Sequence, residues 1–211
     1  MSINLSSWTP PQKGGLFVVT GASGTGKTTL VKAALARFPS IGFSVSATTR
    51  QPRKGEQDGV DYHFLTPSDF QKRIDAGDFL EWANVYGNYY GTLKSPVKKA
   101  IDNGKSILLD IDYQGAEQVR ANALNSISIF VLPPNLEILE HRLRNRKTDS
   151  EQVIQRRMSE AKSQLKHCCD FDYLVVNNDL DSAHDQFQSI LIAELLQSSR
   201  RQNWVDLFTK S

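Results

Sequence analysis

Cysteine, net charge and long apolar runs are all scarce in this chain, and each shortage excludes a class of protein. Among 211 residues only Cys168 and Cys169 are cysteines, and a disulfide between neighbouring residues would be strained. We therefore expect no disulfide-stapled extracellular domain. The formal net charge of +2 is too small to indicate a protein that wraps nucleic acid, so the expected partners are small molecules.

The apolar content also argues against a membrane protein. No apolar run approaches the roughly 18 residues that a membrane-spanning helix needs, and the polar first fourteen residues, with Pro10-Pro11, do not resemble a signal peptide. We expect no membrane partner and a reducing compartment, most simply the cytoplasm. The length suits one well-buried α/β domain with insertions.

A glycine-rich run is the most informative feature that the chain does contain. Gly21-Ala22-Ser23-Gly24-Thr25-Gly26-Lys27-Thr28 follows the apolar stretch Leu16–Val19 and opens a helical pattern from Thr29 to Phe38. Glycines let backbone N–H groups turn toward an anion, the lysine can reach the β- and γ-phosphates, and the threonine hydroxyl can bind Mg²⁺. The run predicts a nucleotide phosphate loop; the alternative is a Gly/Ser-rich connection with an incidental lysine.

The remaining pattern predicts an α/β fold with a parallel sheet of the P-loop NTPase type, flanked by helices. Short runs rich in Ile, Leu and Val are typical of buried parallel strands. They occur at Leu16–Thr20, Ser106–Asp112, Ser126–Leu132 and Tyr173–Val176. Between them, one helix is expected from Ser95-Pro96 to Gly104 and another from Asn135, after Pro133-Pro134.

Two segments break this alternation. Residues 43–92 predict an inserted mixed α/β lobe, with strand-like alternation at Phe43–Ser46 and Tyr62–Phe64 and a short capped helix near Thr66. Residues 139–157 are crowded with basic side chains and predict a mobile helical lid. The expected core is then 15–42, 93–138 and 158–211, within a single domain at 15–197 that follows an extension at 1–14. The apolar tail after Ser198 is compatible with packing on the core or on a second subunit, which leaves a homo-oligomer open.

The inserted lobe carries a polar set that suits a second substrate. Arg50 and Arg53, three residues apart, together with tyrosine hydroxyls, can hold a phosphate dianion by charge-assisted hydrogen bonds. The alternative for the two arginines is ordinary solvated charge. The full set is Ser46, Thr49, Arg50, Arg53, Tyr62, Glu81, Tyr90 and Thr92.

Several long blocks, in order, resemble the signature of guanylate kinases. They are Thr48-Thr49-Arg50-Gln51-Pro52-Arg53-Lys54-Gly55-Glu56 through Gly59-Val60-Asp61-Tyr62-His63-Phe64, Phe79-Leu80-Glu81-Trp82-Ala83, Gly87-Asn88-Tyr89-Tyr90-Gly91-Thr92, Leu109-Asp110-Ile111-Asp112-Tyr113-Gln114-Gly115 and Val176-Asn177-Asn178-Asp179. The resemblance runs from about Leu16 to Leu196. It implies Mg²⁺-dependent transfer of the ATP γ-phosphoryl group to GMP, and to dGMP, in purine nucleotide metabolism.

The resemblance also implies roles for residues in the acceptor site. Those matching positions around the GMP phosphate are Arg50, Arg53, Tyr62 and Tyr90, and those around the guanine are Ser46, Glu81, Thr92 and Asp112. The chemistry agrees for Glu81, because guanine presents N1–H and an exocyclic amine side by side whereas adenine presents an unprotonated N1. The alternative for Glu81 is a surface glutamate at a strand edge.

For the donor site, the resemblance implies ATP contacts from Gly21, Ala22, Ser23, Gly24, Thr25, Gly26, Lys27, Thr28, Thr29 and Asn177, the last near the adenine. Asn177 is alternatively a turn former after a strand. The metal is expected on Thr28 directly and on Asp110 through water. Catalytic charge is expected from Lys27 and the lid arginines Arg142, Arg146 and Arg157, with Arg144 and Arg156 solvated. Lys147 stands where the family usually has glycine.

Two rival functions remain at this stage. Guanylate-kinase-like domains also occur as non-catalytic interaction modules, but those usually lack an intact phosphate loop and lid arginines, which this chain has. A kinase for AMP or dTMP on the same fold is the nearer rival, and the pairing of Glu81 with Ser46 argues against it.

Overall fold

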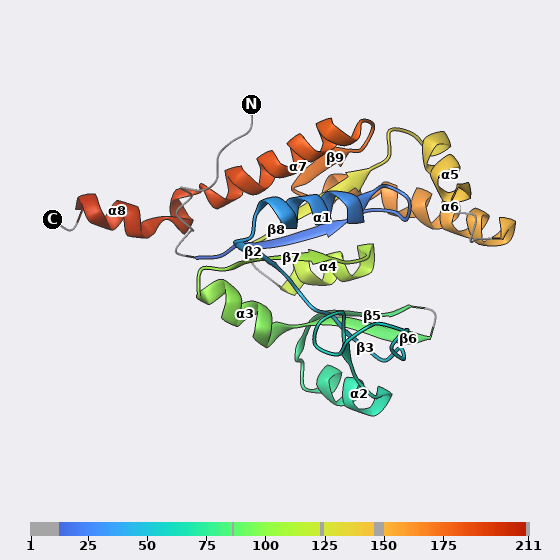
Figure 1. The fold of residues 1–211 in the computed structure, drawn as a ribbon, viewed down its shortest axis with the longest axis horizontal. Coiled ribbons are helices and arrows are strands. Elements are labelled where there is room, and N and C mark those ends of the chain that lie inside the picture. Colours follow the sequence, from blue (N-terminus) through green and yellow to red (C-terminus); the bar gives the residue numbers. More distant parts are fainter. Residues whose placement is uncertain (1–12, 86, 123–124, 146–149, 210–211) are drawn as a thin grey trace.

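A computed structural model describes residues 13–85, 87–122, 125–145 and 150–209 (Figure 1). Within these residues, five strands form a central sheet in the order β2-β7-β1-β8-β9, and every pair in it is parallel. The strands are β1 (Leu16–Thr20), β2 (Ile41–Phe43), β7 (Ser106–Asp110), β8 (Ser126–Leu132) and β9 (Tyr173–Val176). The predicted parallel sheet is thereby confirmed, although β7 ends at Asp110, two residues earlier than expected.

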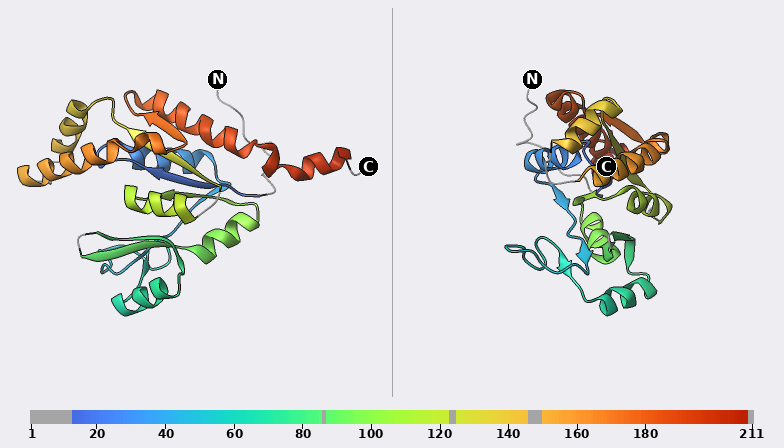
Figure 2. Two further views of the ribbon diagram at one scale, coloured as in Figure 1. Left: turned by 180° about the vertical axis from the view of Figure 1, so that it is seen from behind. Right: turned by 90° about the vertical axis from the view of Figure 1, so that its right-hand side faces the viewer.

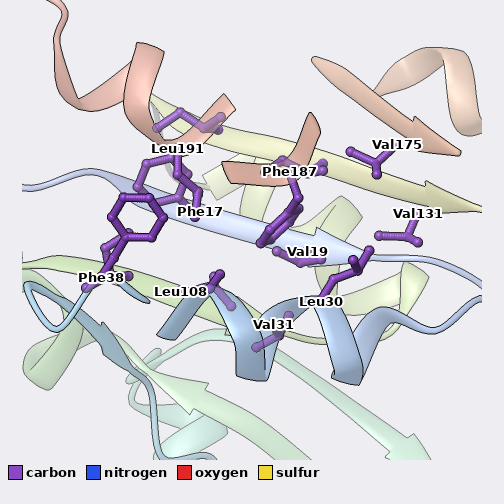
Figure 3. Packing of buried hydrophobic residues seen from close by; sticks show 14 of the residues in the cluster. Phe17, Val19, Leu30, Val31, Phe38, Leu108, Val131, Val175, Phe187 and Leu191 are labelled. Atoms are coloured by element: carbon purple, nitrogen blue, oxygen red, sulfur yellow. The ribbon is translucent and has the colours of Figure 1, made fainter. Parts of the chain in front are cut away.

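Helices cover both faces of this sheet because alternate side chains of its strands point to opposite sides. Phe17 and Val19 of β1 pack on one face, and Leu16 and Val18 pack on the other. The first face is covered by α1 (Lys27–Arg37) and α7 (Leu180–Leu195), whose side chains surround Phe17 and Val19 in Figure 3. The second face is covered by α3 (Lys94–Asp102) and α4 (Tyr113–Asn122).

A smaller sheet carries the inserted lobe. Its order is β4-β3-β6-β5, with β3 and β4 parallel and the other pairs antiparallel. These strands are β3 (Ala47–Thr48), β4 (His63–Phe64), β5 (Phe79–Val85) and β6 (Asn88–Leu93), and α2 (Pro67–Asp75) packs on them. The mixed character expected of this segment is confirmed. In Figures 1 and 2 the small sheet lies on the far side of α4 from the central sheet.

The strand predicted at Phe43–Ser46 is wrong. Phe43 is the last residue of β2 and pairs with Leu108 in the central sheet, and residues 44–46 belong to no strand. Alternation over four residues cannot distinguish the end of a core strand from the start of a lobe strand, because only the partner strand decides this.

The predicted lid consists of two packed helices, α5 (Leu136–Arg144) and α6 (Glu151–Leu165). The Asn135 side chain caps α5 by accepting a hydrogen bond from the N–H of Ile138 at 2.8 Å. Leu139 and Leu143 of α5 pack with Ala161 of α6 and with Ala22. These contacts place the helix pair beside the glycine-rich loop.

The C-terminal helix α8 (Gln202–Thr209) follows η2 (Ser198–Arg200) and projects from the body of the molecule (Figures 1 and 2). Its Leu207 and Phe208 side chains are 65% and 81% exposed. Of the two placements expected for the tail, packing of this apolar face on the core is therefore not observed. Among the helices described, none has the length and apolar character needed to cross a membrane.

Candidate active site

The glycine-rich loop joins the carboxyl end of β1 to the first turn of α1. Gly24 and Gly26 adopt φ of 96° and 90°, a left-handed conformation that other residues rarely adopt. A Cβ on Gly26 would lie 2.1 Å from Nδ2 of Asn177. Both the backbone conformation and the close neighbour therefore require glycine at this position. α1 begins at Lys27, directly after the loop, and the positive end of a helix favours an anion at its N-terminus.

Lys27 is the first residue of α1 and already has an anionic partner. Its Nζ donates to Oδ1 of Asp110 at 2.5 Å and to the carbonyl oxygen of Ile111 at 3.2 Å. Asp110 ends β7, the strand beside β1, so the two parallel strands bring the lysine and the carboxylate to one edge of the sheet. The ammonium group is thereby held over the space where the loop would bind phosphate.

A cavity of about 480 Å³ lies against the loop. It is lined by every predicted loop residue from Gly21 to Thr29 and also by Asp110 and Arg157. The other lining residues are Val85, Ile111, Asp112, Tyr113, Glu160, Ala161 and Gln164. The structure therefore brings the loop, the end of β7 and one predicted lid arginine around a single space.

A second cavity, of about 200 Å³, adjoins the first on the side of the small sheet. Its lining includes five of the residues predicted for the acceptor site: Ser46, Tyr62, Glu81, Tyr90 and Asp112. Val85, Asp110, Ile111 and Asp112 line both cavities. The two cavities are therefore neighbours with a shared wall at the end of β7.

Glu81 is a buried carboxyl group at the floor of the second cavity, with 4% of the residue exposed. Oε1 accepts a hydrogen bond from the hydroxyl of Thr92 at 2.6 Å. Burial, together with the negative charge of Asp112, raises the pKa of Glu81 to about 7, although the Thr92 hydrogen bond opposes the rise. This burial excludes the alternative that Glu81 is a surface glutamate at a strand edge.

The Arg50 guanidinium is fixed at the rim of the same lobe. Its Nη2 donates to Oε1 of Glu56 at 2.9 Å, and its Nη1 donates to the carbonyl oxygen of Gln51 at 2.7 Å. The guanidinium also lies 5.3 Å from the ring centre of Tyr62. Hydrogen bonding to Glu56 raises the pKa of Arg50 above its ordinary value. Arg53 is exposed, and neither Arg50 nor Arg53 lines the cavity.

Comparison with known proteins identifies the family. The family model described as guanylate kinase matches residues 13–194. The chain belongs to the guanylate kinase family. As a member of it, the chain is a kinase that transfers a phosphoryl group from ATP to GMP, which removes both rival functions.

Relatives and solved structures agree with this membership. The chain is 48% identical over 186 residues to a guanylate kinase of Idiomarina loihiensis, covering 87% of this chain and 89% of the relative. It is 48% identical over 197 residues to one of Cereibacter sphaeroides, covering 92% and 93%. A guanylate kinase structure from Anaplasma phagocytophilum superposes with a TM-score of 0.71 at 32% identity, covering 91% of this chain and 92% of that chain.

The resemblance to guanylate kinases places several arginines in the lid, and their surroundings in the structure differ. Arg157 of α6 lines the larger cavity. Arg142 of α5 is half-buried, and its Nη2 donates to the carbonyl oxygen of Asn177 at 3.0 Å. Arg146 and Lys147 lie outside the described residues. Arg144 is exposed, as expected of a solvated arginine, and it pairs at the surface with Glu140 at 2.7 Å and with Glu151 at 2.5 Å, which joins α5 to α6.

Asn177 lies beneath the loop and does not line either cavity. Its side chain is buried, and Nδ2 donates to the carbonyl oxygen of Thr25 at 2.7 Å. Its backbone carbonyl accepts the hydrogen bond from Arg142. The residue thus supports the glycine-rich loop from below and connects it to α5. Its predicted contact with adenine stays a prediction.

Among the residues that line the larger cavity, sequence reasoning missed three polar ones: Tyr113, Glu160 and Gln164. Glu160 and Gln164 follow Arg157 by three and seven positions on α6, which is one face of a helix. That spacing from a residue already singled out was the available signal. Tyr113 starts α4 directly after Asp112 and had no comparable signal.

The residues present fit a hard divalent cation bound mainly through its substrate. The hydroxyl of Thr28 and the carboxylate of Asp110 line one cavity, and both are oxygen donors. In the described part of the chain, no group of three or more His, Cys, Asp or Glu residues could hold a metal ion. Mg²⁺ keeps several waters and takes few protein ligands beside phosphates, so two oxygen donors are enough for such a site.

Proposed function

We propose that this guanylate kinase seats MgATP in the larger cavity and GMP or dGMP in the smaller one. The observation that carries the proposal is the shared wall of Val85, Asp110, Ile111 and Asp112. Two nucleotides placed in adjoining cavities meet at their phosphates, which is the arrangement that direct transfer between them requires. The product GDP would then feed purine nucleotide metabolism, and we propose the cytoplasm as the compartment.

On the donor side, backbone N–H groups of Gly21 to Thr29 would hold the ATP phosphates. Lys27 would exchange its contact with Asp110 for the β- and γ-phosphates. Thr28 would bind Mg²⁺ directly and Asp110 would do so through water. The ion supplies charge neutralisation between the β- and γ-phosphates when it is bound.

On the acceptor side, the ionised Glu81 would accept hydrogen bonds from N1–H and the amine of guanine. Ser46, Thr92 and Asp112 would complete the base site. The GMP phosphate would lie against Arg50, Arg53, Tyr62 and Tyr90. Arg50 and Arg53 must turn inward for this, because neither side chain lines the cavity and Arg53 is exposed.

The transfer itself needs no general base, because the attacking atom is an anionic phosphate oxygen of GMP. That oxygen forms a bond to the γ-phosphorus as the bond from the γ-phosphorus to the leaving oxygen of ADP breaks. Lys27, Arg142, Arg146 and Arg157 would neutralise the oxygens of the moving group. Closure of lobe and lid would exclude water, which otherwise accepts the phosphoryl group.

The proposal is tested by measuring ATP-dependent ADP release with GMP, dGMP, AMP, UMP and dTMP as acceptors. GMP and dGMP should be preferred, since a site that hydrogen-bonds one base edge can discriminate by roughly 10⁴. A preference for AMP would contradict the assignment of Glu81.

The same assay tests the loop lysine. Lys27→Met should lower turnover at least about 10²-fold, in line with loss of one preorganised donor to a transition state. Lys32→Met is the matched control, because Lys32 is exposed on the same helix. Circular dichroism should show both variants folded. Full activity in Lys27→Met would remove that residue from its role.

A further inference from the structure

The base-reading carboxylate of the lobe lies against a helix of the core. In Figures 1 and 2, α4 runs between the central sheet and β5 of the small sheet. β5 is an edge strand, with β6 on one side only. The backbone groups on its other side need partners, because unpaired groups on a strand edge are a liability.

The side chain of Gln118 in α4 supplies hydrogen-bond partners for the backbone of one β5 residue, Trp82. Its Oε1 accepts the N–H of Trp82 at 3.0 Å, and its Nε2 donates to the carbonyl oxygen of Trp82 at 2.7 Å. A carboxamide offers one acceptor and one donor side by side, so it replaces the peptide group of a neighbouring strand. The strand is thereby fixed to α4 at the residue next to Glu81.

Gly115 lies one turn before Gln118 on the same face of α4. A Cβ at Gly115 would lie 2.6 Å from Oε2 of Glu81, closer than any ordinary contact. The N–H of Gly115 donates to Oδ1 of Asp112 at 2.8 Å. The absence of a side chain at this position therefore leaves the space that the carboxylate occupies, and the backbone holds the second acid of the base site.

We propose that the α4 face formed by Gly115 and Gln118 positions the Glu81 carboxylate for guanine. Neither residue contacts the nucleotide: Gln118 acts through the backbone of Trp82, and Gly115 acts by leaving room. The inference rests on the proposed role of Glu81. It predicts that purine selectivity depends on a helix that belongs to the core and not to the acceptor lobe.

The test is steady-state kinetics of Gln118→Met, which keeps the length of the side chain and removes both hydrogen bonds. Its KM for GMP should rise about tenfold, the equivalent of two ordinary hydrogen bonds lost. The kcat and the KM for ATP should stay within about twofold of wild type. The ratio of kcat/KM for GMP to that for AMP should fall. Gln114→Met, on an exposed position of the same helix, is the matched control.

A double-mutant cycle separates positioning from a merely structural effect. If Gln118 acts through Glu81, Gln118→Met should change the KM for GMP much less in a Glu81→Gln background. Equal effects in both backgrounds would overturn the proposal, as would an unchanged KM for GMP. A parallel loss of kcat, ATP affinity and thermal stability would also overturn it, because it would show that Gln118 only supports the fold.

If Gln118→Met does not fold, Gly115→Ala tests the same positioning role of α4. Alanine is favourable in a helix, so any effect should come from its Cβ, which would lie 2.6 Å from Oε2 of Glu81 and 3.3 Å from Oδ1 of Asp112. A selective rise in the KM for GMP supports the proposal, and wild-type kinetics refutes it. If the wild-type enzyme prefers GMP and Glu81→Gln loses that preference, the proposed function stands whatever these α4 variants show.

Discussion

At the scale of one residue, Glu81 shows how burial changes the ionisation of a carboxyl group that we propose binds guanine. The folded chain holds this carboxyl group away from water, which raises its pKa to about 7 from an ordinary value of 4.5. Only the ionised form accepts both guanine N–H groups. The group therefore titrates within the range in which the enzyme would work, and a bound guanine edge would favour ionisation.

GMP affinity should consequently depend on pH. Below pH 7 Glu81 is increasingly protonated, so the KM for GMP at saturating ATP should rise about tenfold between pH 8 and pH 6. The GMP phosphate also titrates in this range, and Glu81→Gln keeps that contribution while removing the carboxyl group. The wild-type curve should therefore be steeper than the variant's. Parallel curves would exclude Glu81 as the titrating group.

The same shift affects stability with a definite sign. Between pH 4.5 and 7 the folded state binds more protons at Glu81 than the unfolded state, so this group's contribution to stability is lost as pH rises through that window. At pH 8 the Glu81→Gln variant should unfold at a higher temperature than wild type. Its free energy of unfolding should exceed the wild-type value by at most about 3 kcal/mol. Calorimetry should show the difference shrinking toward pH 5.

At the scale of elements, the acceptor lobe has a small core of its own. Phe70 of α2 is fully buried and stacks on Phe79 of β5, with ring centres 4.4 Å apart. The ring of Tyr89 in β6 also stacks on the ring of Phe70, with ring centres 5.3 Å apart. The phosphate loop, in contrast, is held by the central sheet. The lobe should therefore be able to unfold while the proposed ATP site stays folded.

Phe70→Ala tests this separation. Removing a buried phenyl ring should destabilise the lobe by about 3–5 kcal/mol, the usual range for this change in a core. GMP binding should weaken strongly while ATP binding persists, as measured by calorimetric titration of each nucleotide. Phe43→Ala is the matched control, because Phe43 ends a strand of the central sheet and is 50% exposed. Equal loss of both nucleotides would show that the two parts unfold together.

At the scale of the whole molecule, three parts meet around the two adjoining cavities: the loop, the small sheet and, through α6, the helix pair α5–α6. Residues of all three line the adjoining cavities. Positive charge from separate parts gathers where the nucleotide anions would lie, so binding of both substrates should draw the parts together.

X-ray scattering can measure this closure. The radius of gyration should decrease when GMP and a non-hydrolysable ATP analogue are both present, and by less with either alone. Lys27→Met should contract with GMP but respond little to the ATP analogue. An unchanged radius with both ligands would contradict closure as the step that excludes water.

Much of the fold and of the site could be predicted because the determining features are local. Left-handed glycines, strand composition and helix caps act over a few residues, and they correctly placed the loop, the helix after Asn135 and most strands of the central sheet. Phe43 was misassigned because its partner, Leu108, is remote in sequence. Arg144 is exposed as expected, but its ion pair with Glu151 could not be predicted, because it depends on how two helices pack.

The sequence by itself determined the family of this protein and predicted its site: a phosphate loop, a base-reading acid and cationic side chains for the transferring group. Tertiary structure decided which groups touch. The contacts Lys27 to Asp110, Asn177 to Thr25 and Gln118 to Trp82 join residues 83, 152 and 36 positions apart. Such pairs form only when burial of apolar surface brings distant segments together, and it is this burial that gives Glu81 its raised pKa.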